Sequence, residues 1–325
     1  MNYFITGGAG FIGSHLVRTL LTEEKNARVV IYDNFSSGKM WHLEGFEQNH
    51  NLLIVRDDIK NKENLQRAMS GTNVVYHFAS NPDIAKAVTQ PDIDFWEGTY
   101  LTNNVLEAMR INGVKKLLYA SGSGVYGDVG LVELQEDYSP MLPISTYGAS
   151  KLSCEAMICA YCYMFGITAS AFRLANVVGP HQTHGVGYDF VRRLMSNSRE
   201  LQILGDGKQR KSYIHVSDVI SATRLLEKRV PDGFSYYNVA TLDYISVTEI
   251  ADIVVSIMGL KNVIYKYTGG DRGWEGDVPI VCLNSNKIRL FGWTNAYSTK
   301  EAIYSSVKSI YEDTKLNKFQ WKDQT

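Results

Sequence analysis

The chain has 325 residues, with 33 Lys plus Arg, 34 Asp plus Glu and a formal net charge of −1, and 45% of its side chains are apolar. This composition excludes an intrinsically disordered chain, and the balanced charge gives no electrostatic indication of nucleic-acid binding, which requires clustered cations. No apolar run reaches the roughly 18 residues that span a bilayer, so we expect a globular protein with no membrane partner. Because 4 Cys are too few for a disulfide framework, we expect it in the reducing cytoplasm.

Short apolar runs alternate with helical patterns through the first half of the chain. The runs that predict strands are residues 3–6, 29–32, 52–55, 74–78, 116–120 and 167–172, and the first helical pattern covers residues 12–21. Apolar runs separated by helices are typical of parallel strands buried on both faces. The pattern therefore predicts an α/β fold with a doubly wound parallel sheet, the Rossmann architecture.

Turns interrupt this rhythm beyond about residue 176, where we expect isolated helices at residues 187–198, 217–228, 246–258 and 299–313. Because single cores stop growing at roughly 250–300 residues, the length predicts a second, smaller lobe. The predicted division is a nucleotide-binding domain at residues 1–175 and a substrate lobe at residues 176–325. We expect ligands in the cleft between the lobes, beyond the carboxyl ends of the strands.

A glycine-rich turn, residues 7–13, follows the first predicted strand and precedes the first helix. Gly7, Gly10 and Gly13 allow a tight turn and a close approach of the backbone to a pyrophosphate, whose charge the helix N-terminus stabilises. A tight turn without any ligand is the alternative for such a motif by itself.

An acidic residue, Asp33, ends the second predicted strand 20 residues after Gly13. A carboxylate at this place accepts hydrogen bonds from both hydroxyls of an adenosine ribose and repels a 2′-phosphate. The order of strand, glycines, helix and acid therefore predicts a bound dinucleotide, and NAD rather than NADP.

Tyr147 and Lys151 lie four residues apart at the start of a helical pattern that ends near Phe165. This spacing places both side chains on one helical face. A cation beside the phenol favours the phenolate, which makes Tyr147 a candidate general base and Lys151 its electrostatic partner. A chance pairing is the alternative, because the chain contains 20 Tyr.

Taken together, these motifs resemble the extended short-chain dehydrogenase/reductases, and in particular their NAD-dependent nucleotide-sugar epimerases and dehydratases. The segments that carry the resemblance are residues 7–13, 33–34, 58–59, 125–127, 147–151 and 173–176, and in the second lobe residues 204–218 and 272–277. The resemblance covers nearly the whole chain. It implies that residues 213–243 return to the Rossmann domain.

The resemblance implies an NAD-dependent epimerase that acts on a nucleotide-diphosphate sugar, most simply at C4 of a UDP-sugar through a transient 4-keto intermediate. It implies cofactor contacts by Gly7, Gly10, Phe11, Ile12, Gly13, Asp33, Asn34, Ser36, Ser37, Gly38, Asp58, Ile59, Phe78, Ala79, Ser121, Tyr147, Lys151 and Ala175. It implies substrate contacts by Asn176, Lys211, Arg272 and Asp277. It also implies a homodimer formed by the helices at residues 103–111 and 152–165.

Three positions depart from the family pattern. The family's catalytic Ser or Thr, 25 residues before the Tyr, is Gly122, so we expect Ser123 or Ser121, or a water, to supply the missing hydrogen bond. The family's Asn four residues before the Thr of Gly98-Thr99 is Phe95, and its Arg-Asp pair is Lys211-Ser212.

Two alternative functions follow from the same positions. Family dehydratases and decarboxylases carry a Glu just before residues 125–127, where this chain has Ser123 and Gly124, so both are less favoured than an epimerase. Another nucleotide-sugar enzyme of the family remains an alternative. A second is an NAD-binding sensor or interaction protein whose catalysis is weakened by Gly122.

The sequence predicts no metal site. Cys159 and Cys162 have the spacing of half a zinc site, but no second pair of Cys or His lies at ligand spacing. We expect free thiols instead.

Overall fold

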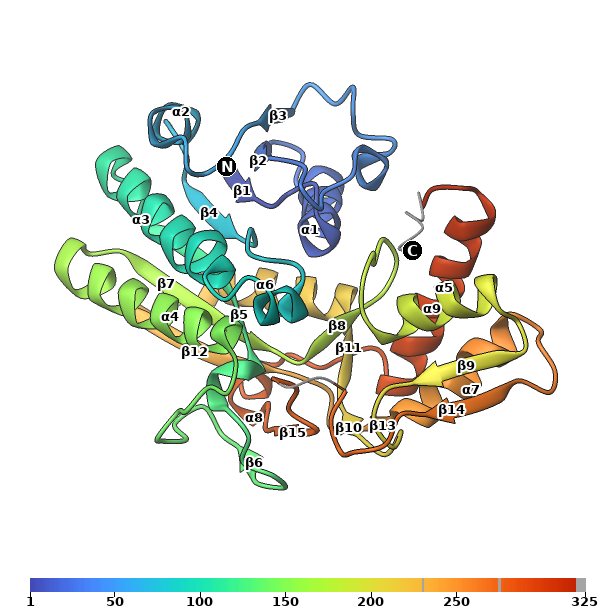
Figure 1. Cartoon of the computed structure of the whole chain (residues 1–325). Helices are drawn as coiled ribbons and strands as arrows, with labels where there is room; N and C mark the ends of the chain where they lie inside the picture. Colours follow the sequence, from blue (N-terminus) through green and yellow to red (C-terminus); the bar gives the residue numbers. More distant parts are fainter. Residues whose placement is uncertain (230, 274–275, 320–325) are drawn as a thin grey trace. The chain divides into compact units, whose positions relative to one another are not determined.

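The computed structural model describes residues 1–229, 231–273 and 276–319 (Figure 1). These residues form two compact units, which are described separately. The first unit contains Met1–Gly127, Glu136–Leu174 and Ile220–Asn238. The second contains Asp128–Gln135, Ala175–Val219 and the described residues from Val239 onward.

A seven-stranded sheet, in the order β12-β7-β5-β4-β1-β2-β3, forms the centre of the first unit. Its strands are β1 Asn2–Thr6, β2 Arg28–Asp33, β3 Leu52–Arg56, β4 Val74–His77, β5 Lys116–Gly122, β7 Thr168–Leu174 and β12 Phe234–Val239. The pairs from β7 to β3 are parallel. Burial on both faces explains the apolar runs, and all four residues of β4 are buried.

Helices cover this sheet. They are α1 Phe11–Glu23, α2 Lys62–Ala68, α3 Tyr100–Asn112, α4 Thr146–Phe165 and α6 Val216–Arg229, the last of which begins in the second unit. Figure 1 shows α3 and α4 side by side, and Val105 and Ile158 from these helices pack with Tyr119 of β5 in one apolar cluster. Helix α4 is capped by Ser145 at its start and ends at Gly166, whose left-handed backbone (φ 63°) favours glycine.

Four short helical segments connect these elements: η1 Met40–Leu43, η2 Ile84–Val88, the π-helical η3 Phe95–Thr99, and η4 Ser123–Tyr126. The segment η4 follows β5 directly, so the strand gives way to a helical turn at Ser123.

The second unit combines short strands with helices. The strands are β6 Glu133–Leu134, β8 Asn176–Val178, β9 Glu200–Ile203, β10 Arg210–Lys211, β11 Tyr213–His215, β13 Ile245–Ser246, β14 Ile264–Tyr267 and β15 Ile280–Leu283. The helices are α5 Val186–Ser196, α7 Val247–Ile257, α8 Asn286–Arg289 and α9 Thr299–Lys315. Ser246 with Glu249, and Ser298 with Glu301, form capping boxes that fix the starts of α7 and α9.

The parallel sheet with flanking helices confirms the predicted Rossmann architecture. Strands β2 and β3 lie on one side of β1, and the chain then returns to place β4 on the other side. The strand order therefore reverses at β1, and such a switch point opens a ligand site at the carboxyl ends of the strands. Among the described residues, no helix has the length and apolarity to cross a membrane.

Candidate active site

The glycine-rich turn lies at the switch point and tolerates no larger residue at its two ends. Gly7 has a left-handed backbone (φ 70°), and its amide donates to the Tyr32 carbonyl at 3.1 Å. A Cβ at Gly13 would lie 2.2 Å from the Gly7 carbonyl oxygen, and one at Gly7 would lie 2.8 Å from the Ala79 amide. The turn is therefore pressed against both α1 and the end of β4.

The turn leaves the start of α1 open to an anion. Gly10 is the N-cap and supplies no side-chain acceptor, so within the described part of the chain no side chain caps the first amides of α1, which begin at Phe11 and Ile12. The positive end of the helix dipole adds to these donors. A pyrophosphate fits at these donors. The missing Cβ at Gly13 lets the start of α1 approach the Gly7 carbonyl oxygen closely, which holds the turn against the helix.

Asp33 lies at the end of β2 against the same turn. Its carboxylate accepts hydrogen bonds from the backbone amides of Ala9 at 2.9 Å and Phe35 at 2.8 Å, and its side chain is buried. Burial raises the pKa of Asp33 above its ordinary value of 3.8, although the two amides oppose the shift. A carboxylate fixed beside the turn has the position that an adenosine ribose requires.

The loop after Asp33 folds back over the turn. The Lys39 amide donates to the Ala9 carbonyl, and a Cβ at Gly38 would lie 3.0 Å from the Asp33 Oδ1 atom. Ser36 and Ser37 lie within this loop, where the Ser36 amide donates to the Asn34 side chain. Asn34 in turn donates to Asp58 at 2.9 Å, whereas the next residue, Ile59, is buried in the apolar cluster.

The residues after β4 lie beside those after β1. The amides of Phe78 and Ala79 donate to the carbonyl and the hydroxyl of Thr6, at 3.2 and 3.4 Å. The Thr6 hydroxyl also contacts the buried ring of His77 at 2.6 Å. The next strand after β4 in the sheet is β5. Helix α4, which carries Tyr147 and Lys151, is attached to β5 because Lys151 donates to its Ala120 carbonyl.

Tyr147 and Lys151 lie one turn apart near the start of α4, as predicted. The Lys151 ammonium is 5.4 Å from the centroid of the Tyr147 ring and 5.0 Å from that of Tyr119. It is buried and donates to the Ala120 carbonyl on β5 at 2.7 Å. A cation held in this way stabilises negative charge on the phenol oxygen.

The end of β5 distinguishes the two candidate hydroxyls. The Ser121 hydroxyl is buried and donates to Glu155 at 2.6 Å, within the protein interior. Ser123 begins η4, and no hydrogen bond to its hydroxyl is found within the described residues. Next to it, a Cβ at Gly148 would lie only 2.4 Å from the Gly124 carbonyl oxygen, so the start of α4 packs directly on this turn. Gly122 is extended (φ −158°), and an added Cβ there meets no atom within 4 Å.

A buried carboxylate that the sequence interpretation missed, Asp94, anchors the start of α4. It accepts from Thr146 at 2.7 Å and from Asn81 at 2.8 Å, and its carbonyl accepts from Ser150 at 2.7 Å. Thr146 and Ser150 flank Tyr147 in the sequence, and their hydroxyls are the signal that could have indicated an acceptor. The adjacent Phe95, which replaces the family's Asn, is half-exposed beside Trp96.

Three of the four predicted substrate residues meet in the second unit. Lys211 Nζ lies 2.5 Å from Asp277 Oδ1, and Arg272 donates to the Asp277 carbonyl at 2.7 Å. Arg272 also pairs with Asp128 at 2.5 Å, a residue that the sequence interpretation did not select although it directly follows residues 125–127. Trp274 and Glu275, within the predicted segment 272–277, lie outside the described residues.

The other predicted residues of this unit lie at β8. Asn176 begins β8 with an exposed side chain and pairs with Tyr213 of β11. Ala175 is buried, and its amide donates to the Val239 carbonyl at 3.1 Å. In the described part of the chain, neither Asn176 nor Ala175 forms a hydrogen bond with Lys211, Arg272 or Asp277.

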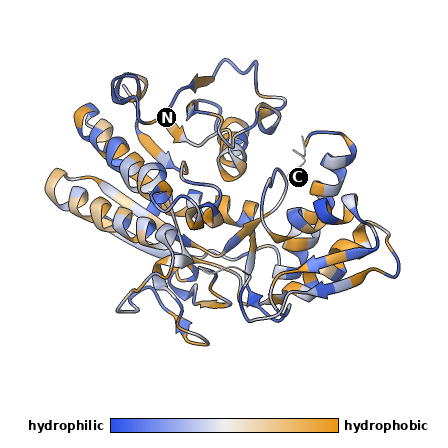
Figure 2. Cartoon of the chain, viewed as in Figure 1, coloured by the Kyte–Doolittle hydropathy of each residue, from blue (hydrophilic) through white to orange (hydrophobic). Residues whose placement is uncertain are grey.

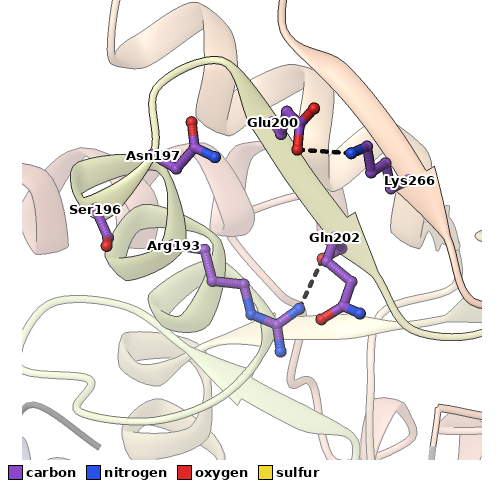
Figure 3. A pocket seen from close by; sticks show the side chains of 6 residues that line it. All are labelled: Arg193, Ser196, Asn197, Glu200, Gln202 and Lys266. Atoms are coloured by element: carbon purple, nitrogen blue, oxygen red, sulfur yellow. Dashed lines mark hydrogen bonds and ion pairs between the residues drawn. The ribbon is translucent and has the colours of Figure 1, made fainter. Parts of the chain in front are cut away.

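A separate surface hollow in the second unit is lined by Arg193, Ser196, Asn197, Glu200, Gln202 and Lys266 (Figure 3). Its charged groups already have partners: Lys266 pairs with Glu200 at 2.7 Å, and Arg193 donates to the Gln202 backbone carbonyl. This arrangement does not present a set of convergent groups for chemistry.

Cysteines and histidines do not form a metal centre within residues 1–229, 231–273 and 276–319. Cys154 and Cys162 are buried free thiols, whereas Cys159 between them is an exposed one.

The chain is similar to known proteins over most of its length. Residues 3–240 match the model of the NAD dependent epimerase/dehydratase family. A putative UDP-glucose 4-epimerase of Methanocaldococcus jannaschii is 32% identical over 305 residues, which cover 92% of this chain and 95% of the relative.

Solved structures are similar over the same span. A UDP-galactose 4-epimerase superposes with a TM-score of 0.85 at 36% identity, covering 96% of this chain and 99% of that one. The UDP-glucose 4-epimerase of Thermus thermophilus, solved in complex with NAD, superposes with a TM-score of 0.84 at 28% identity, covering 95% and 99%. This chain belongs to the NAD dependent epimerase/dehydratase family and is NAD-dependent.

Proposed function

We propose that the protein is a nucleotide-sugar 4-epimerase that acts on a UDP-hexose or a UDP-N-acetylhexosamine through a transient 4-keto sugar. The observation that carries the proposal is the pair of Tyr147 and the buried Lys151 ammonium, which lies 5.4 Å from the ring centroid and is bound to β5, the strand beside β4. NAD supplies the acceptor and donor of a hydride in such a reaction.

The roles of the chain's own residues follow from their positions. Tyr147 takes the proton from the C4 hydroxyl of the sugar and returns it after the keto sugar has turned its other face to the cofactor. Lys151 stabilises the negative charge on the phenol oxygen. Ser123 donates a hydrogen bond to the reacting oxygen in place of the hydroxyl that Gly122 lacks, whereas Ser121 is engaged by Glu155.

The cofactor is bound by the turn around Gly7, Gly10 and Gly13, with Asp33 on the adenosine ribose. In the second unit, Lys211 and Arg272 pair with the diphosphate, which competes with Asp277 and Asp128 for these cations. Asn176 contacts the sugar or the diphosphate. The first compact unit then serves as the NAD domain and the second as the substrate lobe. The domain predicted at residues 1–175 differs from the first unit by Asp128–Gln135 and Ala175, and the predicted returning segment 213–243 is longer than Ile220–Asn238.

The experiment is conversion of UDP-glucose, UDP-N-acetylglucosamine and UDP-glucuronate by the purified protein, with separation of the products. Tyr147→Phe is expected to retain NAD and to lose about 10²- to 10⁴-fold in turnover, because it removes only the proton acceptor. If no sugar is converted while NAD is bound, the epimerase proposal fails.

A second candidate function is favoured by Gly122. A protein that binds NAD but has weak catalysis, and that acts as a sensor or binding partner, needs no hydroxyl at this position. A Tyr147-dependent conversion of any of the three sugars would exclude it. A dehydratase or decarboxylase is less favoured, since Ser123 and Gly124 stand where those enzymes carry a Glu.

We also propose that the protein is a cytoplasmic homodimer. The homodimer rests on the apolar outer face of α4, including Cys159, Tyr163 and Met164, which is exposed in the single chain. The cytoplasmic location rests on the small number of cysteines, which suits a reducing compartment. Static light scattering that gives the mass of one chain would contradict it.

A further inference from the structure

A buried ion pair joins α4 to β7 beneath the turn that carries Gly122 and Ser123. Arg173 of β7 donates to both carboxylate oxygens of Glu155, with a shortest distance of 2.7 Å, and both side chains are almost completely buried. Burial of two charges is unfavourable unless their remaining hydrogen-bonding groups are satisfied. The partners that satisfy them show what the pair holds in place.

Two of these partners lie at the two ends of one short segment, residues 121–126, and a third is the Glu136 carbonyl, which accepts from Arg173 at 2.8 Å. At its start, Ser121 donates to Glu155 Oε1 at 2.6 Å. At its end, the Tyr126 hydroxyl accepts from Arg173 at 2.9 Å and donates to Asn238 at 2.7 Å. Gly122 and Ser123 lie between these two attachments, so the ion pair fixes the segment from both sides.

The same pair aligns the segment with Tyr147 and Lys151. Tyr147, Lys151 and Glu155 follow one another at intervals of four residues and therefore share one face of α4. Lys151 donates to the Ala120 carbonyl at 2.7 Å, and Glu155 accepts from Ser121, the next residue of β5. Two successive turns of α4 thus hold two successive residues of β5.

We propose that Glu155 and Arg173, acting through Ser121 and Tyr126, are positioning residues that hold the segment 121–126 in register with Tyr147 and Lys151. The inference rests on the proposed nucleotide-sugar activity for its kinetic test. It assigns the Ser121 hydroxyl to alignment of the site, rather than to the contacts with the sugar or the cofactor that the sequence led us to expect.

The test compares Ser121→Ala with a matched control, Ser170→Ala. Ser170 is a buried residue of β7 in the same sheet. Its hydroxyl contacts the Ser235 hydroxyl of β12 at 2.7 Å, rather than a residue of α4. Both substitutions remove one buried hydroxyl. Glu155→Gln is a harsher variant because it leaves the Arg173 charge without its partner, so the comparison at Ser121 is decisive.

We expect Ser121→Ala to lower kcat about 10-fold or more, with KM within about 2-fold and bound NAD unchanged, because a small displacement of reacting groups is costly. Ser170→Ala is expected to leave kcat within about 2-fold of the unsubstituted protein. If Glu155→Gln folds, adding Ser121→Ala to it should cause little further loss, since both act through one contact. Equal kcat values for Ser121→Ala and Ser170→Ala would overturn the proposal.

Amide hydrogen exchange supplies a readout that needs no substrate. Residues 119–126 should exchange faster in Ser121→Ala than in Ser170→Ala, and equal rates would again overturn the proposal. If the unsubstituted protein converts no sugar, the proposed function fails, whereas the exchange comparison still decides whether the ion pair aligns the segment.

Discussion

Two glycines near Tyr147 differ in what a side chain would meet. A Cβ at Gly148 would lie 2.4 Å from the Gly124 carbonyl oxygen, so glycine is required where α4 packs on the turn. An added Cβ at Gly122 meets no atom within 4 Å, and its extended backbone is open to any residue. Packing therefore does not explain the glycine at the position of the family's catalytic hydroxyl.

Alanine substitutions measure this difference directly. We expect Gly122→Ala to change the free energy of unfolding by no more than about 0.5 kcal/mol, as at unconstrained sites. Gly148→Ala should cost about 1–3 kcal/mol because the new methyl group forces the turn away from α4. Urea denaturation of both variants checks this, and similar stabilities would show that α4 can move.

The Asp33 carboxylate links cofactor binding to pH. Burial raises the pKa of Asp33 above 3.8, so the carboxylate begins to take up a proton at a higher pH than an exposed Asp. Since only the ionised form accepts from both ribose hydroxyls, NAD affinity should weaken on acidification from a pH above 3.8. Asp33→Asn should bind NAD about 10-fold or more weakly and lack this transition, which calorimetric titration across the pH range can detect.

A buried histidine near the same strand ends predicts acid sensitivity of the fold. Burial, and then the charge of Lys151, lowers the pKa of His77 from 6.5 to about 3. The unfolded chain therefore binds the extra proton first, and the contribution of His77 to stability is full above pH 6.5 and lost as the pH falls towards 3. The loss is on the order of 4 kcal/mol.

Denaturation at several pH values tests this contribution. His77→Gln should flatten the dependence of unfolding free energy on pH between 6.5 and 3. An unchanged slope in His77→Gln would mean that other groups cause the acid sensitivity.

At the scale of elements, α4 was predictable as a helix, but its attachments were not. The spacing of Tyr147 and Lys151 places them on one face by local geometry alone. Asp94 lies on another segment, 52 residues before Thr146, and Arg173 lies on the following strand, 18 residues after Glu155. Only folding brings Asp94 to Thr146 and Ser150, and Arg173 to Glu155. No periodic pattern marks such partners, because each depends on how the loops and strands pack.

The N-cap of α4 offers a test at this scale. The Ser145 hydroxyl accepts from the Gly148 amide at 3.1 Å, so Ser145→Ala should cost about 1 kcal/mol of stability. Ser145→Asp retains an acceptor and should cost less. Thermal denaturation that ranks the two variants in the opposite order would contradict the capping role.

For the whole molecule, the exposed face of α4 carries the proposal of a homodimer. Figure 2 shows this helix largely in the colours of apolar and intermediate residues, and Tyr163 and Met164 at its end are 94% and 68% exposed. An apolar face of this kind is typical of a surface that a second subunit covers.

Charge introduced on this face should separate the subunits. Tyr163→Glu is expected to give the mass of a single chain in light scattering, because a carboxylate resists burial. Leu290→Glu, at an equally exposed apolar residue of the other compact unit, should leave the mass unchanged. A dimer that survives Tyr163→Glu would place the interface elsewhere.

Local sequence patterns were enough to predict the parallel sheet, the glycine-rich turn, Asp33 and the pair of Tyr147 and Lys151. These features depend on strand periodicity, on the backbone freedom of glycine and on spacing within one helix, all of which are local. The tertiary structure decided that Ser121 turns to Glu155, that Asp94 anchors α4, and that Asp128 and Asp277 meet Lys211 and Arg272. These contacts join residues far apart in the chain, and their geometry is set by packing that no local pattern encodes.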